Sequence, residues 1–303
     1  MSLVNRHLSM HTPVLLQEVI EGLALHPGAI VLDATIGYGG HSGEICRRIG
    51  PKGILVGIDE DANALSFTLE RLPPGTCRPK LREGNFRNLD SILSEEKVIE
   101  VDAVVFDLGI SSPQLDSSGR GFTFQKDEPL GMTLAITPRT GQPTAEEIVN
   151  EWSEEHLADI IYGFGGERFS RRVAHAIVLA REQKPIKTTA ELVALIEGAI
   201  PGRRGKIHKA TKTFQALRIA ANDELGALKE ALPKAWAHLK HRGRMVVISF
   251  HEHEDRIVKQ FFREKKFADE AIIYTKKPII PSRKEILENP RSRSAKLRIV
   301  EKK

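Results

Sequence analysis

Three glycines within four positions make residues 33–43 the stretch of this 303-residue chain best suited to binding chemistry. Gly37, Gly39 and Gly40 follow an apolar run at 29–32 and precede a periodic segment at 44–49, which predicts a strand, a loop and a helix. Glycine at such a junction indicates positive φ or a backbone that approaches a ligand closely. The start of the helix favours a carboxylate or phosphate, because it presents N–H groups and the positive end of the helix dipole. The alternative is a plain strand-to-helix turn.

Two acids and a phenylalanine stand at the ends of later apolar runs. Asp59 follows the run at 54–58, about twenty residues past the glycine loop, where an acid can bind the ribose hydroxyls of a nucleoside-bearing cofactor. Its alternative role is to cap a helix that begins near Ala62. Phe86 follows a strand predicted at 80–83, and either stacks on a purine or packs in the core. Asp107 follows the strand predicted at 101–106.

A parallel sheet is the element that would bring these residues together. Strands alternate with helices through the first 110 residues or so, which is typical of parallel strands joined by right-handed crossovers. We therefore expect an α/β fold with a Rossmann-like sheet, completed by strands at 245–250, 271–275 and 296–300. Ligands of such sheets bind at the carboxyl ends of the strands. Those ends carry Asp33, Gly37, Asp59, Phe86 and Asp107.

Between these strands the alternation stops and helical signals follow one another. Thr144 and Thr188 each stand three residues before a glutamate, which is capping-box spacing, and Ser153 can cap a further helix. We expect a discontinuous α/β domain at 1–119 and 213–303, and an inserted helical domain for substrate recognition at 120–212. Residues 213–240 predict crossover helices broken at Pro233. A first helix is expected after Thr12, with Pro13 at its first position.

Composition describes an ordinary globular protein, with 41% apolar and 28% charged residues. The amino terminus lacks a continuous apolar segment, and no run is long enough to cross a bilayer, so we expect a cytoplasmic protein with no membrane partner. Cys46 and Cys77 show no C-x-x-C spacing; they fit a reducing compartment and no zinc site. We expect no metal.

A run of basic residues lies where the predicted insertion rejoins the sheet. A net charge of +5 is mild support for an anionic partner, and such runs are usually solvated faces. A basic patch at this place would give salt-dependent affinity for nucleic acid without reading its sequence. The predicted RNA-binding residues are Arg203, Arg204, Lys206, Lys209 and Lys212. A second group of basic residues occupies 283–298.

The glycine loop does not match a dinucleotide site. With Gly37 and Gly39 in place, the dinucleotide fingerprint requires glycine at position 42, where this chain has Ser42. S-adenosylmethionine fits better, because it offers a ribose to Asp59, an adenine to Phe86 and a carboxylate to the loop. Its sulfonium favours a nearby acid such as Asp107. An NAD-linked enzyme stays the alternative at this point.

Ordered blocks along most of the chain resemble the RsmH (MraW) family. These blocks are His11 with Val14–Leu16, Asp33 with Thr35, Gly37 and Gly39–Ser42, Asp107–Asp116, Arg120–Phe122, Gly166–Phe169, Lys212–Ile219, and Ser249–His251 with Glu254–Lys259. The resemblance implies S-adenosylmethionine-dependent methylation of the exocyclic N4 of a cytidine in the decoding region of small-subunit ribosomal RNA, free or assembled. It places cofactor-binding residues at Gly39, Gly40, His41, Asp59, Phe86, Asp107 and Gln114, beside the Gly37 that the loop itself indicates.

The stretch after the strand at 101–106 suits amine methylation. Cytosine N4 is a weak nucleophile, so an acceptor must take a hydrogen bond from the amino group as it reacts. Asp107, Ser111, Ser112 and backbone carbonyls near Pro113 are the predicted catalytic groups. Methylation of carbon 5 would need a cysteine nucleophile here, and neither cysteine is near. His251 either lines the same pocket or caps the helix that follows it.

One loop departs from the family pattern. Where the family usually has Asp-Met-Arg-Met, this chain has Gly131-Met132-Thr133-Leu134, without the acid and the base. Two further alternatives follow: an RNA-binding protein that holds S-adenosylmethionine without efficient turnover, or a methyltransferase that acts on another RNA amino group. The sequence does not indicate an oligomeric state.

Overall fold

The computed structural model describes residues 13–202 and 207–303. His11, Thr12, Arg203, Arg204 and Lys206 lie outside the described residues. The chain folds into two compact units, one running up to Gly109 and again from Ala227 to Lys303, the other from Ile110 to Gly226. The second unit is longer than the predicted insertion at 120–212, because α5 and α10 contribute Leu115, Phe214 and Leu217 to its core.

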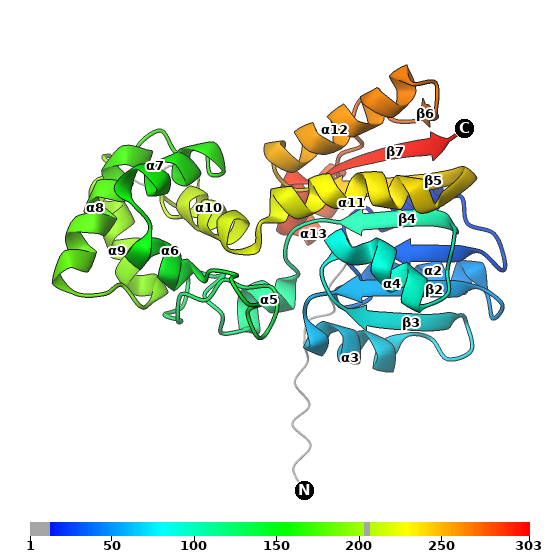
Figure 1. Cartoon of the computed structure of the whole chain (residues 1–303), viewed down its shortest axis with the longest axis horizontal. Coiled ribbons are helices and arrows are strands. Elements are labelled where there is room, and N and C mark those ends of the chain that lie inside the picture. Colours follow the sequence, from blue (N-terminus) through cyan, green and yellow to red (C-terminus); the bar gives the residue numbers. More distant parts are fainter. Residues whose placement is uncertain (1–12, 203–206) are drawn as a thin grey trace, which may run out of the picture. The chain divides into compact units, whose positions relative to one another are not determined.

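A seven-stranded sheet forms the centre of the first unit (Figure 1). Its order is β3-β2-β1-β4-β5-β7-β6, in which β7 runs antiparallel to its neighbours β5 and β6 and the other pairs are parallel. The predicted Rossmann-like α/β class is confirmed. The strands are β1 (Ile30–Asp33), β2 (Ile54–Asp59), β3 (Arg78–Glu83), β4 (Val101–Asp107), β5 (Leu239–Ser249), β6 (Ala271–Ile273) and β7 (Lys296–Lys302).

Helices cover both faces of this sheet, as the continuous apolar strands require. Side chains of β1, β2, β4 and β5 that point to one face pack on α1, α2 and α3, and those that point to the other pack on α4, α11 and α12. The helices are α1 (Leu16–Leu23), α2 (Gly40–Ile49), α3 (Ala62–Arg71), α4 (Leu89–Glu95), α11 (Glu224–His238), α12 (Glu252–Phe267) and α13 (Arg283–Glu288), with 3-10 turns η1 (Phe86–Asn88) and η2 (Pro290–Ser294).

The second unit is helical. Thr144 and Thr188 form the predicted capping boxes, and Ser153 caps α7. The buried faces of these helices form a core of their own, which includes Leu157, Ile177 and Leu192. Its helices are α5 (Ser112–Ser117), α6 (Ala145–Glu151), α7 (Glu154–Gly163), α8 (Ser170–Gln183), α9 (Thr189–Ala199) and α10 (Thr211–Asn222).

Two local predictions about helices are wrong. The first helix begins at Leu16 and not at Pro13. Helix α11 continues through Pro233, because burial of its face, which includes Leu232 and Trp236, outweighs the hydrogen bond that proline cannot donate. The break comes earlier, where Asp223 adopts a left-handed conformation after α10.

The cysteines are also not the free thiols that a reducing compartment implies. Cys46, on the buried face of α2, forms a disulfide with Cys77, which stands just before β3. The Cα atoms of the two residues lie 5.0 Å apart. Sequence spacing could not show this, because two cysteines 31 positions apart meet only through the packing of α2 on the sheet.

Candidate active site

The glycine loop joins β1 to α2 in backbone conformations that favour glycine. Gly37 has φ of 49° and Gly39 has φ of 76°, so the predicted positive φ is confirmed at both. A Cβ on Gly39 would lie 2.7 Å from Cγ2 of Thr68 on α3. The loop therefore packs against α3 so closely that a side chain at position 39 does not fit.

Asp59, at the end of β2, holds this loop. One carboxylate oxygen accepts the backbone N–H of Gly37 at 2.9 Å, and the other accepts that of Asp61 at 2.9 Å. Asp61, and not Asp59, is the N-cap of α3, so the alternative role for Asp59 is wrong. Burial raises the pKa of Asp59 to about 7, against the lowering effect of these two backbone N–H groups.

Asp33 ends β1, and its carboxylate accepts hydrogen bonds from two residues of the glycine stretch that follows. Ser42 Oγ donates to Asp33 Oδ2 at 2.5 Å, and the backbone N–H of Thr35 donates to Oδ1 at 3.2 Å. Asp33 is buried, and burial raises its pKa to about 6. Ser42, which weakened the dinucleotide interpretation, thus connects α2 to the end of β1.

Asp107 ends β4, the strand beside β1. Its backbone N–H donates to Thr35 Oγ1 at 2.6 Å, which fixes the start of the following loop. Its Oδ2 lies 3.5 Å from Nδ1 of His41, whereas Oδ1 is buried and has no hydrogen-bond partner among the described residues. Burial raises the pKa of Asp107 to about 7, and the negative charge of Glu254 makes a smaller contribution in the same direction.

Phe86 follows β3 at the start of η1. Its ring packs edge-to-face on Phe106, with 5.8 Å between the ring centroids, and the residue is half-buried. One side of the ring therefore contributes to the core. The other proposed role, stacking on a purine, stays a prediction.

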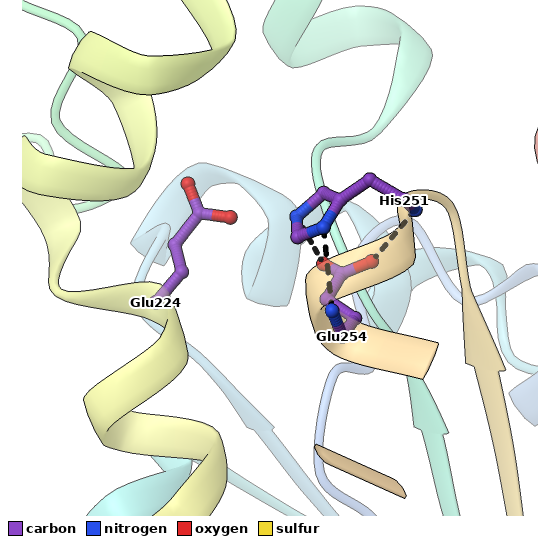
Figure 2. A group of neighbouring side chains, drawn as sticks. All are labelled: Glu224, His251 and Glu254. Atoms are coloured by element: carbon purple, nitrogen blue, oxygen red, sulfur yellow. Dashed lines mark hydrogen bonds and ion pairs between the residues drawn. The ribbon is translucent and has the colours of Figure 1, made fainter. Parts of the chain in front are cut away.

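His251 caps the helix after β5, as its alternative role predicts. Its Nδ1 accepts the backbone N–H of Glu254 at 3.3 Å, and the Glu254 carboxylate in turn accepts the backbone N–H of His251 at 3.2 Å (Figure 2). The same carboxylate accepts the backbone N–H of Phe250 at 2.8 Å. Both side chains are at least nine-tenths buried. This capping box places a further acid, Glu254, near the carboxyl edge of the sheet, which also carries Asp33, Asp59 and Asp107.

These residues of the first unit fit S-adenosylmethionine. Helix α2 has Gly39 as its N-cap residue and therefore no side-chain cap, so its first turn is suited to the carboxylate of the ligand. Asp59 keeps acceptor capacity for ribose hydroxyls beyond its two backbone bonds, since an ionised carboxylate has about four acceptor sites. The unpartnered Oδ1 of Asp107 suits a donor or a cation.

The other predicted catalytic residues belong to the second unit, where they begin α5. Ser111 and Gln114 form a capping box: Gln114 Oε1 accepts from the backbone N–H and hydroxyl of Ser111 at 2.9 and 3.0 Å. The Ser111 hydroxyl is thus used in capping, which the S-x-x-Q spacing could have indicated. Ser112 and Pro113 occupy the first two helical positions and are half-buried.

Two of the predicted RNA-binding residues can be placed. Lys209 Nζ donates to the carbonyls of Ile200 and Glu197 at 2.6 and 3.3 Å, and Lys212 Nζ donates to the carbonyl of Gly166 at 2.8 Å. Both lysines therefore help to hold loops of the second unit, and these neutral carbonyls do not compensate their positive charges. Binding of RNA by the two lysines stays a prediction.

Sequence reasoning missed the residues that support the acids. Thr35 and Ser42 stand inside the glycine stretch, and a hydroxyl next to a glycine loop was a usable signal. Thr68 donates to the carbonyl of Gly37 at 2.8 Å from the middle of α3, where nothing in the sequence singles it out. Glu254 could have been found from its capping-box spacing to His251.

The chain matches the model of the MraW methylase family over residues 8–303. It is 43% identical over 311 residues to a ribosomal RNA small subunit methyltransferase H of Acetivibrio thermocellus, covering 96% of this chain and 98% of that protein. Proteins of the same name from Symbiobacterium thermophilum and Persephonella marina are 45% identical, with coverage of 96% of this chain and 96% and 99% of theirs. None of the helices within the described residues has the length and apolarity that a bilayer span requires.

Proposed function

Because the chain belongs to the MraW methylase family, we propose that it transfers the methyl group of S-adenosylmethionine to the exocyclic N4 of a cytidine in the decoding region of small-subunit (16S) ribosomal RNA. The relatives are named for methylation of small-subunit ribosomal RNA. The observation that carries the finer proposal is Oδ1 of Asp107, a buried acceptor without a partner among the described residues, at the carboxyl edge of the sheet.

Bound S-adenosylmethionine supplies an electrophilic methyl group. Gly37, Gly39 and Gly40, with His41 at the start of α2, would hold its amino-acid end, Asp59 its ribose and Phe86 its adenine. Gln114 is assigned to the same ligand by family resemblance. The protein's part is then to orient the base, because in-line alignment of the two reacting atoms supplies much of the rate.

Asp107 is the catalytic acceptor in this proposal. A cytosine amino group becomes nucleophilic when its lone pair leaves conjugation with the ring, and a hydrogen bond to Asp107 Oδ1 favours that state. The same oxygen can take the proton that the amino group loses. Ser112 and Pro113, which follow Asp107 in the sequence, are also proposed as catalytic residues, while Ser111 fixes the start of α5. A base in structured RNA has to swing out of its stack to reach such a site.

The helical unit from Ile110 to Gly226 is proposed to recognise the RNA. Its described lysines, Lys209 and Lys212, and the neighbouring Arg203, Arg204 and Lys206 would neutralise phosphates. No metal is part of the proposal. The chain is proposed to act in the cytoplasm.

Transfer of label from methyl-labelled S-adenosylmethionine tests the proposal. Wild-type protein should label small ribosomal subunits or their RNA and leave large subunits unlabelled. Asp107→Asn, which keeps the size of the side chain and removes the carboxylate, should lower labelling by about 100-fold or more. Binding of the cofactor without labelling of either substrate would support the alternative, a binding protein without turnover. Label at an RNA amino group other than cytosine N4 would support the third interpretation.

A further inference from the structure

His41 occupies the first turn of α2, between the end of β4 and the residues before α1. Its Nε2 lies 2.9 Å from the carbonyl oxygen of Val14, and its Nδ1 lies 3.5 Å from Oδ2 of Asp107. The imidazole is buried, with 6% of its side chain exposed, against 21% for Asp107. Both ring nitrogens of His41 therefore face an oxygen atom inside the protein.

The two oxygens fix where the protons must be. A carbonyl oxygen can only accept, so Nε2 of His41 carries a hydrogen and donates it to Val14. In the neutral ring Nδ1 then holds a lone pair, and this lone pair faces the carboxylate of Asp107. Two acceptors face each other favourably only when a proton lies between them. The geometry thus calls for one proton between Nδ1 and Oδ2.

Burial favours the uncharged form of the pair. Burial lowers the pKa of His41, while Val14, Asp33 and Glu285 of α13 act against this effect. Burial and Glu254 of α12 raise the pKa of Asp107 to about 7. The shared proton therefore belongs to the Asp107 carboxyl, which donates to a neutral His41.

We propose that His41 and Asp107 share a single proton in the ligand-free protein, and that the pair releases it to solvent when a sulfonium cation is bound. This second part rests on the proposed function. Asp107 is then an ionised acceptor when the substrate amine arrives. As the N–C bond forms, the S–C bond to the methyl group breaks and its electron pair stays on sulfur. An N–H bond of the amine also breaks, and its electron pair stays on nitrogen. An O–H bond forms on Asp107, and the pair again holds one proton. His41 is a positioning residue that sets the protonation of Asp107.

Proton release on ligand binding tests the proposal without any turnover. Calorimetry at pH 6.5 in buffers of different ionisation enthalpy compares S-adenosylmethionine with S-adenosylhomocysteine, which has the same amino-acid and nucleoside parts but no sulfonium charge. Binding of S-adenosylmethionine should release roughly half a proton or more in excess of the protons released on binding of S-adenosylhomocysteine, because the sulfonium cation lowers the pKa of Asp107. His41→Asn should reduce this difference, since Asp107 loses the partner of its proton, and Asp107→Asn should abolish it. Equal release by both ligands in the wild type would overturn the proposal.

Nitrogen-15 NMR of the histidine rings tests the proposal on the wild-type protein, so it does not depend on whether the variants fold. In the ligand-free wild type at neutral pH, His41 should show the neutral Nε2–H tautomer. A protonated ring at neutral pH, or the Nδ1–H tautomer, would contradict the proposal. Neither measurement needs RNA, so a protein that binds the cofactor and methylates nothing would sink the proposed function and leave this inference standing.

The pH profile of methyl transfer separates the positioning role from a structural one. The rate should rise with pH as Asp107 ionises, and His41→Asn should move the midpoint of that rise to lower pH. A purely structural role would change KM for the cofactor and leave the midpoint where it is. An unmoved midpoint would therefore count against the proposal.

Discussion

Asp59 accepts the backbone N–H of Gly37 across a distance of 2.9 Å, which ties the end of β2 to the loop that follows β1. A single carboxylate thus fixes the conformation of the glycine loop and is also the group proposed to bind the ribose. The conformation of the loop and the proposed cofactor site depend on the same side chain.

Replacing Asp59 should weaken both the fold and the proposed site. Asp59→Ala removes the acceptor of two backbone N–H groups, so we expect a loss of about 1 to 3 kcal/mol in the free energy of unfolding. The affinity for S-adenosylmethionine should fall at least about tenfold, which is about 1.4 kcal/mol. Calorimetry and urea unfolding measure the two effects. Glu83→Ala is the control, because Glu83 is the exposed residue that pairs with Asp59 at the end of β3; an equal loss of affinity there would contradict the assignment.

Two glycines four positions apart should respond in opposite directions to alanine. Gly39 has φ of 76° and no room for a Cβ, so Gly39→Ala should destabilise the protein by roughly 1 to 2 kcal/mol and reduce cofactor affinity. Gly43 lies inside α2 and has open space around it, so Gly43→Ala should stabilise by about 0.5 to 1 kcal/mol. Thermal unfolding of both variants checks this. Equal effects would mean that the loop tolerates a side chain.

Much of this arrangement could be predicted from the sequence, because the signals are local. The strand ends carrying Asp33, Asp59 and Asp107 follow from apolar runs, and parallel pairing then places them at one edge. What the sequence could not provide depends on tertiary packing. Thr68 reaches the glycine loop only because α3 folds back on it, and the Cys46–Cys77 disulfide depends on the packing of α2.

The free energy of unfolding contributed by three buried aspartates should fall as the pH rises from about 4 to 7. The pKa values of Asp33, Asp59 and Asp107 are raised from 3.8 to about 6, 7 and 7, so the folded protein keeps protons that the unfolded chain has released. Stability from these groups is therefore fully present below pH 4 and is lost toward pH 7. His41 opposes this trend below pH 6.5, because its lowered pKa keeps it neutral in the folded state.

Asp107→Asn isolates one of these contributions. The variant should unfold at higher urea concentration than wild type at pH 7.5, and the advantage should shrink toward pH 5.5, since the carboxyl of the wild type is then protonated. Urea unfolding at several pH values between 5.5 and 7.5 gives both curves. Parallel curves would show that the pKa of Asp107 is not raised in the folded protein.

The basic run should contribute electrostatic affinity for RNA. If Arg203, Arg204 and Lys206 each neutralise a phosphate, their combined replacement by alanine should lower RNA affinity and reduce the slope of log K against log salt concentration by roughly two to three. Lys52→Ala is the control, because Lys52 is an exposed cation in the turn before β2, at the opposite ends of the strands from Asp107. A slope unchanged in the triple variant would exclude these residues from the RNA interface.

Identification of the modified nucleoside tests the central claim most directly. Small ribosomal subunits, and small-subunit ribosomal RNA free of protein, should be incubated with S-adenosylmethionine and the protein, digested to nucleosides and analysed by mass spectrometry beside Asp107→Asn. Formation of N4-methylcytidine by the wild type, and its loss in the variant, is the predicted result. Absence of N4-methylcytidine from both substrates, with the cofactor bound, would contradict the account.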